Sequence, residues 1–157
     1  MATFVLCHGA HSGAWEWRAV IDLLRADGHT VFAPTLTGLG QRVHLANSGV
    51  NLETHINDIA NEILFEQLSD VVLVGHSYGG MVITGVADRI PERLSQLIYL
   101  DALVPQDGQS VADMLGPDVT AQLRQLTDAV GEGWKVPHIP EAGKPADPRY
   151  VPLPIET

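Results

Sequence analysis

The segment Asp70–Gly80 constrains the fold of this chain more than any other stretch. It reads D-V-V-L-V-G-H-S-Y-G-G, and its four consecutive branched aliphatic residues, Val71 to Val74, carry no polar alternation. A short apolar run of this kind is typical of a strand that is buried on both faces of a parallel sheet. A glycine-rich turn and a helical pattern follow it. Strand, tight turn and helix in this order predict that Ser77 lies at a sharp turn above the edge of a sheet.

Ser77 is the central residue of a G-x-S-x-G pattern. A sharp strand-to-helix turn brings the backbones so close that side chains at Gly75 and Gly79 would clash. The turn places Ser77 at the N-terminus of the next helix, where the Tyr78 N–H can meet a developing oxyanion. We therefore expect Ser77 to be a nucleophile and Tyr78 to supply one oxyanion donor. The alternative is that Ser77 only caps the helix of an ordinary glycine-rich junction.

The first hundred residues alternate apolar runs with helical patterns. Besides the serine strand, strands are expected at 3–7, 29–33 and 94–100, and helices at about 14–26, at 52–68 and after the serine turn. Asn51 is the expected N-cap of the second of these helices. Strands that alternate with helices of a dozen or more residues indicate βαβ units, and hence a parallel sheet covered on both faces. The sequence thus predicts a three-layer α/β fold.

The pattern changes after Pro105. Ser110 and Asp113 fit a capping box that opens a short helix, and a second helical pattern covers residues 120–130. From Gly131 onward the chain holds six of its ten prolines and shows no clear periodicity. This tail is predicted to be extended or irregular.

Composition and charge exclude several classes of function. The chain has 157 residues, which is the size of one domain, and its net charge of −10 argues against nucleic acid or an anionic membrane as a partner. Cys7 is the single cysteine, so nothing requires an oxidising compartment. No apolar run reaches membrane-spanning length and no signal-peptide pattern opens the sequence, so a cytoplasmic location is expected. Because the glycines near Gly9 lack the phosphate-binding spacing and no metal-ligand spacing is visible, we expect neither a cofactor nor a metal.

A second donor for the oxyanion is expected in the loop His8-Gly9-Ala10, which follows the first apolar strand. The Ala10 N–H is the candidate donor, and His8 is expected to brace the loop through hydrogen bonds. Acyl transfer by serine requires two such donors in addition to the nucleophile and its base. An ordinary strand–helix loop is the alternative interpretation of these residues.

The other histidines of the first eighty residues are expected to lie in different surroundings. His76 is adjacent to Ser77, so its side chain points away from the serine and cannot be its base. His11 is expected either to line the mouth of a pocket or to be simply exposed. His29, His44 and His55 are predicted to be solvated, because they show no metal spacing.

Four segments resemble the α/β-hydrolase superfamily, and more narrowly the branch of small bacterial carboxylesterases, plant methyl-ester esterases and hydroxynitrile lyases. They are F-V-L-C-H-G at residues 4–9, G-A-W-E-W at 13–17, G-H-S-Y-G-G at 75–80 and L-D-A-L-V-P at 100–105. The resemblance covers essentially the whole chain. It implies a core over residues 1–104 and part of a lid over residues 105–157, with Gly9, His11 and Trp134 as candidate pocket residues.

The resemblance also implies the chain order serine, acid, histidine, with the acid and the histidine on strands beyond the lid. This sequence ends inside the lid. We therefore expect a second polypeptide segment to supply both groups and complete the sheet, or self-association through its open edge. Within the chain, Ser77, Asp101 and His138 satisfy the same order and form the alternative triad.

The resemblance implies that Ser77 hydrolyses small carboxylic esters, with a small-molecule ester as the substrate. Lyases of this branch usually carry threonine at the position of Gly9 and glutamate at that of His76, so esterase is favoured over hydroxynitrile lyase. A non-catalytic ligand-binding protein of the same fold and an inactive fragment remain as alternatives.

Overall fold

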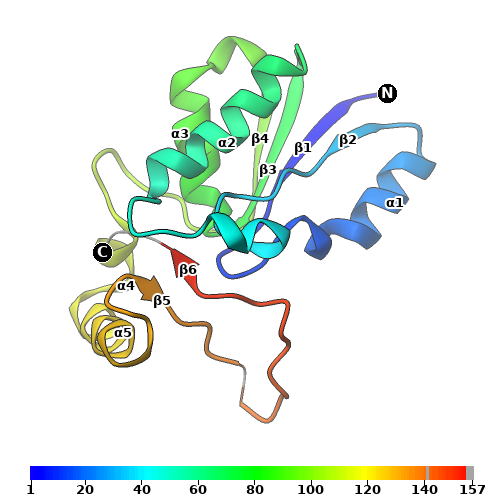
Figure 1. The fold of residues 1–157 in the computed structure, drawn as a ribbon. Helices are drawn as coiled ribbons and strands as arrows, with labels where there is room; N and C mark the ends of the chain where they lie inside the picture. Colours follow the sequence, from blue (N-terminus) through cyan, green and yellow to red (C-terminus); the bar gives the residue numbers. More distant parts are fainter. Residues whose placement is uncertain (141, 155–157) are drawn as a thin grey trace.

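The computed structural model describes residues 1–140 and 142–154 and contains a four-stranded sheet in the order β2-β1-β3-β4 (Figure 1). Its strands are β1 (Thr3–Cys7), β2 (Thr30–Phe32), β3 (Val71–Ser77) and β4 (Leu94–Ala102). All three pairings are parallel. The predicted α/β fold class is confirmed, and the serine strand β3 is one of the two inner strands, paired with both β1 and β4.

Helices cover both faces of this sheet. The helical elements of the core are η1 (Ala14–Trp17), α1 (Arg18–Ala26), η2 (Gly40–Leu45), α2 (Leu52–Phe65), α3 (Gly79–Arg89) and η3 (Pro91–Arg93). The expected helix at 14–26 is divided into a 3₁₀ turn and an α-helix. Asn51 caps α2 as predicted, because its side chain accepts a hydrogen bond from the Thr54 N–H at 3.0 Å.

Two apolar clusters hold the three layers together. Alternate residues of a strand point to opposite faces, so Val5 and Cys7 pack with α2 and α3 while Leu6 packs with Trp17 and α1. On the α2–α3 side, Ile59, Ile63, Val82, Ile83 and Val86 are fully buried. The doubly buried strands inferred from the apolar runs are therefore present for β1 and β3.

Residues 105–140 and 142–154 lie beyond the carboxyl ends of the strands (Figure 1). They form α4 (Val111–Leu115), α5 (Pro117–Val130) and an antiparallel pair of two-residue strands, β5 (Lys135–Val136) and β6 (Leu153–Pro154). The capping box at Ser110 is confirmed. The short β5–β6 pair was not predicted, and it places Leu153 against the main core.

The strand β4 borders the sheet. Only β3 pairs with it among the described residues, so its other side carries no strand there. Leu100 on this strand and Val104 just after it are about half exposed, at 49% and 54%. No helix among the described residues is long and apolar enough to cross a membrane.

Two neighbouring residues of α2 provide a test of this packing. Ile63 is completely buried, whereas the next residue, Leu64, is 37% exposed. We expect Ile63→Ala to lower the free energy of unfolding by about 2–5 kcal/mol, because the cavity it leaves adds to the lost burial. The control Leu64→Ala should cost about 1 kcal/mol or less. Urea unfolding followed by circular dichroism measures both values, and equal losses would contradict the described orientation of α2.

Candidate active site

Ser77 lies at the end of β3 in a backbone conformation that L-residues rarely adopt, with a φ of +53°. The turn is held by a hydrogen bond from the Leu103 N–H to the Ser77 carbonyl, at 3.0 Å. Its hydroxyl has no hydrogen-bond partner among the described residues, and the residue flanking α3 as N-cap is Tyr78. The interpretation of Ser77 as an N-cap is therefore wrong.

The glycines of the turn are required by close backbone contacts. A Cβ at Gly75 would lie 2.6 Å from the Gly79 carbonyl oxygen, and a Cβ at Gly79 would lie 2.7 Å from that of Cys7. A Cβ at Gly80 would clash with the Leu103 carbonyl oxygen. These distances are too short for any side chain, so the sharp turn exists only with glycine at these positions.

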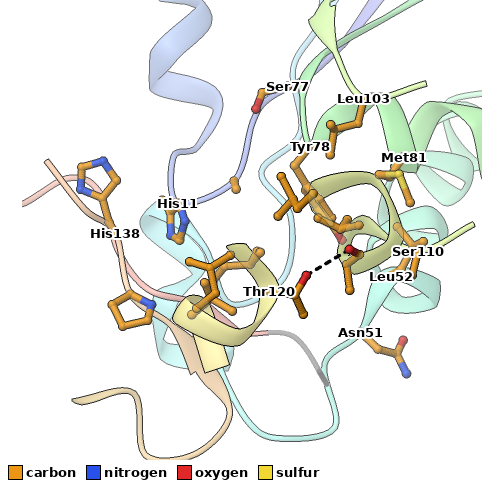
Figure 2. A pocket seen from close by; sticks show the side chains of 18 of the residues that line it. His11, Asn51, Leu52, Ser77, Tyr78, Met81, Leu103, Ser110, Thr120 and His138 are labelled. Atoms are coloured by element: carbon orange, nitrogen blue, oxygen red, sulfur yellow. Dashed lines mark hydrogen bonds between the residues drawn. The ribbon is translucent and has the colours of Figure 1, made fainter. Parts of the chain in front are cut away.

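A cavity of about 930 Å³ opens beside Ser77 between the core and the described residues of the region 105–154 (Figure 2). Ala10 and Tyr78, the two candidate oxyanion donors, border it together with the serine. Most of the other lining residues are apolar and come from both parts of the chain: Leu52, Met81, Leu103, Val111, Leu115, Leu123, Val136, Pro137, Ile139 and Leu153. A site of this size and polarity suits a mostly apolar small molecule.

Two expected pocket residues lie elsewhere. Trp134 is not among the residues that line the cavity, and Lys135 lies over its ring at 4.7 Å from the centroid. The cavity is instead lined by Val136, two residues further along the chain. Gly9 is buried behind the serine, where a Cβ would lie 3.2 Å from the Ser77 Cβ. Gly9 thus permits the close approach of the loop and does not line the pocket.

His8 braces the loop after β1, as predicted. Its Nε2 accepts a hydrogen bond from the Leu36 N–H at 3.1 Å, so the ring proton is on Nδ1, which donates to the Gly9 carbonyl at 2.8 Å. Burial is the main cause that lowers the pKa of His8 to about 4. His8 is therefore a neutral structural residue at neutral pH.

His11 lines the pocket, which excludes the alternative that it is simply exposed. Its φ is +65°, and it is bound to the tail in two ways. Its Nδ1 lies 3.1 Å from the Val151 carbonyl oxygen, and its own carbonyl accepts a hydrogen bond from the Val151 N–H at 2.8 Å. Burial lowers the pKa of His11 to about 4.

The His76 side chain contacts η1 and has no hydrogen bond to Ser77 among the described residues, in agreement with the prediction that it points away from the serine. Its Nδ1 lies 2.7 Å from a carboxylate oxygen of Glu16, and its ring meets Trp17 edge to face. Glu16 lies on η1, so this contact joins the first helical element to β3.

His55 is fully buried, and the prediction that it is solvated is wrong. Its Nδ1 lies 3.0 Å from the Tyr78 hydroxyl and its Nε2 lies 2.9 Å from the Thr37 carbonyl oxygen. The sequence contained the signal, because His55 shares the apolar face of α2 with Ile56 and Ile59. His29 is half-buried and its Nδ1 accepts a hydrogen bond from the Ala2 N–H, so the prediction that His29 is solvated is wrong as well. His44 is exposed, as expected.

The alternative triad is not assembled. His138 stacks on Tyr150 with ring centroids 4.5 Å apart and lies 5.4 Å from the ring of His11. Asp101 is exposed at the end of β4. Within residues 1–140 and 142–154, no hydrogen bond joins any two of Ser77, Asp101 and His138. The described residues therefore place no base on the serine.

The family model "Alpha/beta hydrolase family" matches residues 4–154, and the chain belongs to this family. It is 55% identical over 126 residues to a carbendazim hydrolyzing esterase of Nocardioides sp. strain SG-4G, covering 78% of this chain and 52% of the relative. It is 37% identical over 123 residues to Methylesterase 1 of Arabidopsis thaliana, covering 71% of this chain and 43% of the relative.

Solved structures agree with this assignment. An extracellular α/β-hydrolase from a Paenibacillus species superposes with a TM-score of 0.81 at 35% identity, covering 88% of this chain and 56% of that chain. The plant methylesterase MES16 from Arabidopsis superposes with a TM-score of 0.62 at 31% identity, covering 75% of this chain and 51% of that one. The chain spans about half the length of the relatives it matches.

The two histidines of the loop after β1 make stability depend on pH. Both His8 and His11 have a pKa of about 4 in the folded chain against 6.5 ordinarily, so the unfolded chain takes up protons first as the pH falls. The contribution of these two neutral rings to the free energy of unfolding is complete above pH 6.5 and is lost as the pH falls toward 4. When the pH falls from 7.5 to 5, we expect the titration of each histidine to lower the free energy of unfolding by about 2 kcal/mol.

Urea unfolding at the two pH values checks this with a matched pair of variants. His11→Asn removes one titrating ring, and asparagine tolerates a positive φ, so the pH dependence should shrink by about 2 kcal/mol. The exposed His44→Asn should leave it unchanged. The same pH dependence in His11→Asn as in the unchanged chain would rule out a neutral, buried His11.

Proposed function

We propose that Ser77 is the nucleophile of an esterase that hydrolyses small carboxylic esters. The observation that carries this proposal is the free Ser77 hydroxyl on a strained turn, facing a mostly apolar cavity beside Ala10 and Tyr78. The names of the relatives support it, since one is a carbendazim hydrolyzing esterase and others are methylesterases. Methyl esters and carbendazim are therefore the first substrates to test.

The reaction would proceed in two steps. The Ser77 oxygen attacks the ester carbonyl while a base takes its proton, and the negative charge that develops on the carbonyl oxygen is stabilised by the N–H groups of Ala10 and Tyr78. The alcohol leaves with the proton and an acyl-enzyme remains. Water activated by the same base then releases the carboxylic acid and restores the serine.

The base and its acid partner are proposed to come from a segment outside these 157 residues. Three of the described histidines near the turn are already engaged: His8 and His55 are buried and hydrogen-bonded, and His76 is bound to Glu16. The relatives are about twice as long as the matched region. Further strands would pair with the open side of β4, next to the half-exposed Leu100. Self-association through the same edge is the competing outcome.

A ligand-binding protein without catalysis is the second candidate. The cavity of about 930 Å³ and the absence of a base on Ser77 among the described residues favour it. The two functions differ in whether bound ester is turned over.

The test combines this chain with a segment that supplies the acid and the base; the complex is called the completed enzyme. The segment is taken from the part of the Nocardioides esterase that this chain does not match, co-expressed with the 157 residues. We expect hydrolysis of a methyl ester and of carbendazim, and Ser77→Ala should lower kcat/KM by roughly 10³-fold or more. The exposed Ser69→Ala is the control. Unchanged hydrolysis in Ser77→Ala would refute the serine mechanism, and tight binding without turnover would favour the second candidate.

A further inference from the structure

The two halves of the candidate oxyanion hole lie on segments that are far apart in sequence. Ala10 follows β1, whereas Tyr78 follows β3. The segment after β1 is hydrogen-bonded through His8 to a short piece of chain after β2, and the segment after β3 is connected to the same piece through His55 of α2. His8 is hydrogen-bonded to Leu36 and His55 to Thr37, so the two buried histidines bind consecutive residues of this piece of chain.

The donors and acceptors of this connection have a single consistent assignment. The Leu36 N–H can only donate, so His8 accepts at Nε2 and donates from Nδ1 to Gly9. The Thr37 carbonyl can only accept, so His55 carries its proton on Nε2. Its Nδ1 then accepts the hydroxyl proton of Tyr78 at 3.0 Å. Burial lowers the pKa of both rings, so both are neutral at neutral pH, and with neutral rings this is the assignment in which each uses both nitrogens.

The intervening piece of chain is itself fixed. Asp58, one turn after His55 on α2, accepts hydrogen bonds from the Thr37 N–H at 2.6 Å and from its hydroxyl at 2.9 Å. Arg42 donates to Asp58 at 3.2 Å and to the Thr35 carbonyl at 2.8 Å. Thr37 is therefore a firm anchor for His55.

Glycine at position 79 and this hydrogen-bonded path have different effects. Because a Cβ at Gly79 would lie 2.7 Å and 2.9 Å from the Cys7 and His8 carbonyl oxygens, glycine permits the close approach of the two segments. It does not by itself hold them together. The path from His8 through Leu36, Thr37 and His55 to Tyr78 is attractive, and beyond the pairing of β1 with β3 it restrains the two segments from moving apart.

We propose that His55 is a positioning residue that sets the spacing between the Ala10 and Tyr78 N–H groups by holding the Tyr78 hydroxyl. This inference rests on the proposed function. His55 is not among the residues that line the cavity and has no hydrogen bond to Ser77 among the described residues, so it acts through Tyr78. Because a displacement of about 1 Å in an active site is enough to cost up to 10²-fold in rate, loss of this restraint should affect chemistry more than binding.

The first experiment is nitrogen-15 NMR of the histidine rings in the 157-residue chain, which needs no activity. We expect the His55 ring to be neutral with its proton on Nε2 at pH 7, and Tyr78→Phe to shift the Nδ1 resonance, since that atom loses its donor. A His55 ring with the proton on Nδ1, or one that Tyr78→Phe leaves unchanged, would overturn the proposal.

The second experiment measures kcat and KM of the completed enzyme for His55→Leu, Tyr78→Phe and the double variant. We expect kcat to fall about 10- to 100-fold with KM within about 3-fold, and the double variant to be no worse than the poorer single one, because both changes break one path. His55→Asn, whose amide oxygen lies near the position of Nδ1, should recover part of kcat. The exposed His44→Leu is the control.

The outcomes separate this proposal from the proposed function. If Ser77→Ala inactivates the enzyme but His55→Leu and Tyr78→Phe only lower the melting temperature, with kcat unchanged well below it, His55 is merely structural and this inference fails. If Ser77→Ala remains active, the proposed function fails, and the NMR result alone decides whether the His55–Tyr78 contact exists. If His55→Leu does not fold, Tyr78→Phe and His55→Asn carry the kinetic test.

Discussion

The turn after β3 depends on backbone atoms that approach more closely than any side chain allows. Gly75 and Gly79 face each other across the turn, and Gly79 also lies against the carbonyls that end β1. In this turn Ser77 has a φ of +53° and lies beside the loop of His8 and Ala10. Packing between β1 and β3 is thus the constraint on which the position of Ser77, the proposed nucleophile, and of its neighbours depends.

Neutral histidines occupy the interior around this turn. Burial lowers the pKa values of His8, His11 and His55, so none carries a charge at neutral pH that would need compensation in the core. A neutral ring offers one donor and one acceptor, and His8 and His55 use both. They join loops that the sheet alone does not hold, which a purely apolar side chain at the same positions would leave unconnected.

The sequence predicted the layers well because apolar runs and helical spacing report burial directly. Val71–Val74 and the G-x-S-x-G pattern were enough to place Ser77 on a strand–turn–helix. Metal-ligand spacing does not reveal that His55 is buried, whereas its place on the apolar face of α2 does. Two further predictions are wrong for another reason, namely that Asp101 and His138 complete a triad with Ser77 and that Trp134 lines the pocket. Chain order does not reveal that His138 stacks on Tyr150 or that Val136 lines the cavity in place of Trp134.

The proposed function assigns its two chemical requirements to different parts of the molecule. Stabilising an oxyanion requires fixed N–H dipoles, and in the proposed function β1, β3 and the buried histidines hold the segments that carry them. Activating a serine requires a base whose ring is free to gain and lose a proton. The buried rings of His8 and His55 are unsuited to that task, because burial lowers their pKa and both nitrogens are bound. The proposed esterase mechanism therefore requires a base on a different element, and we propose that such an element pairs with the side of β4 that carries no strand among the described residues.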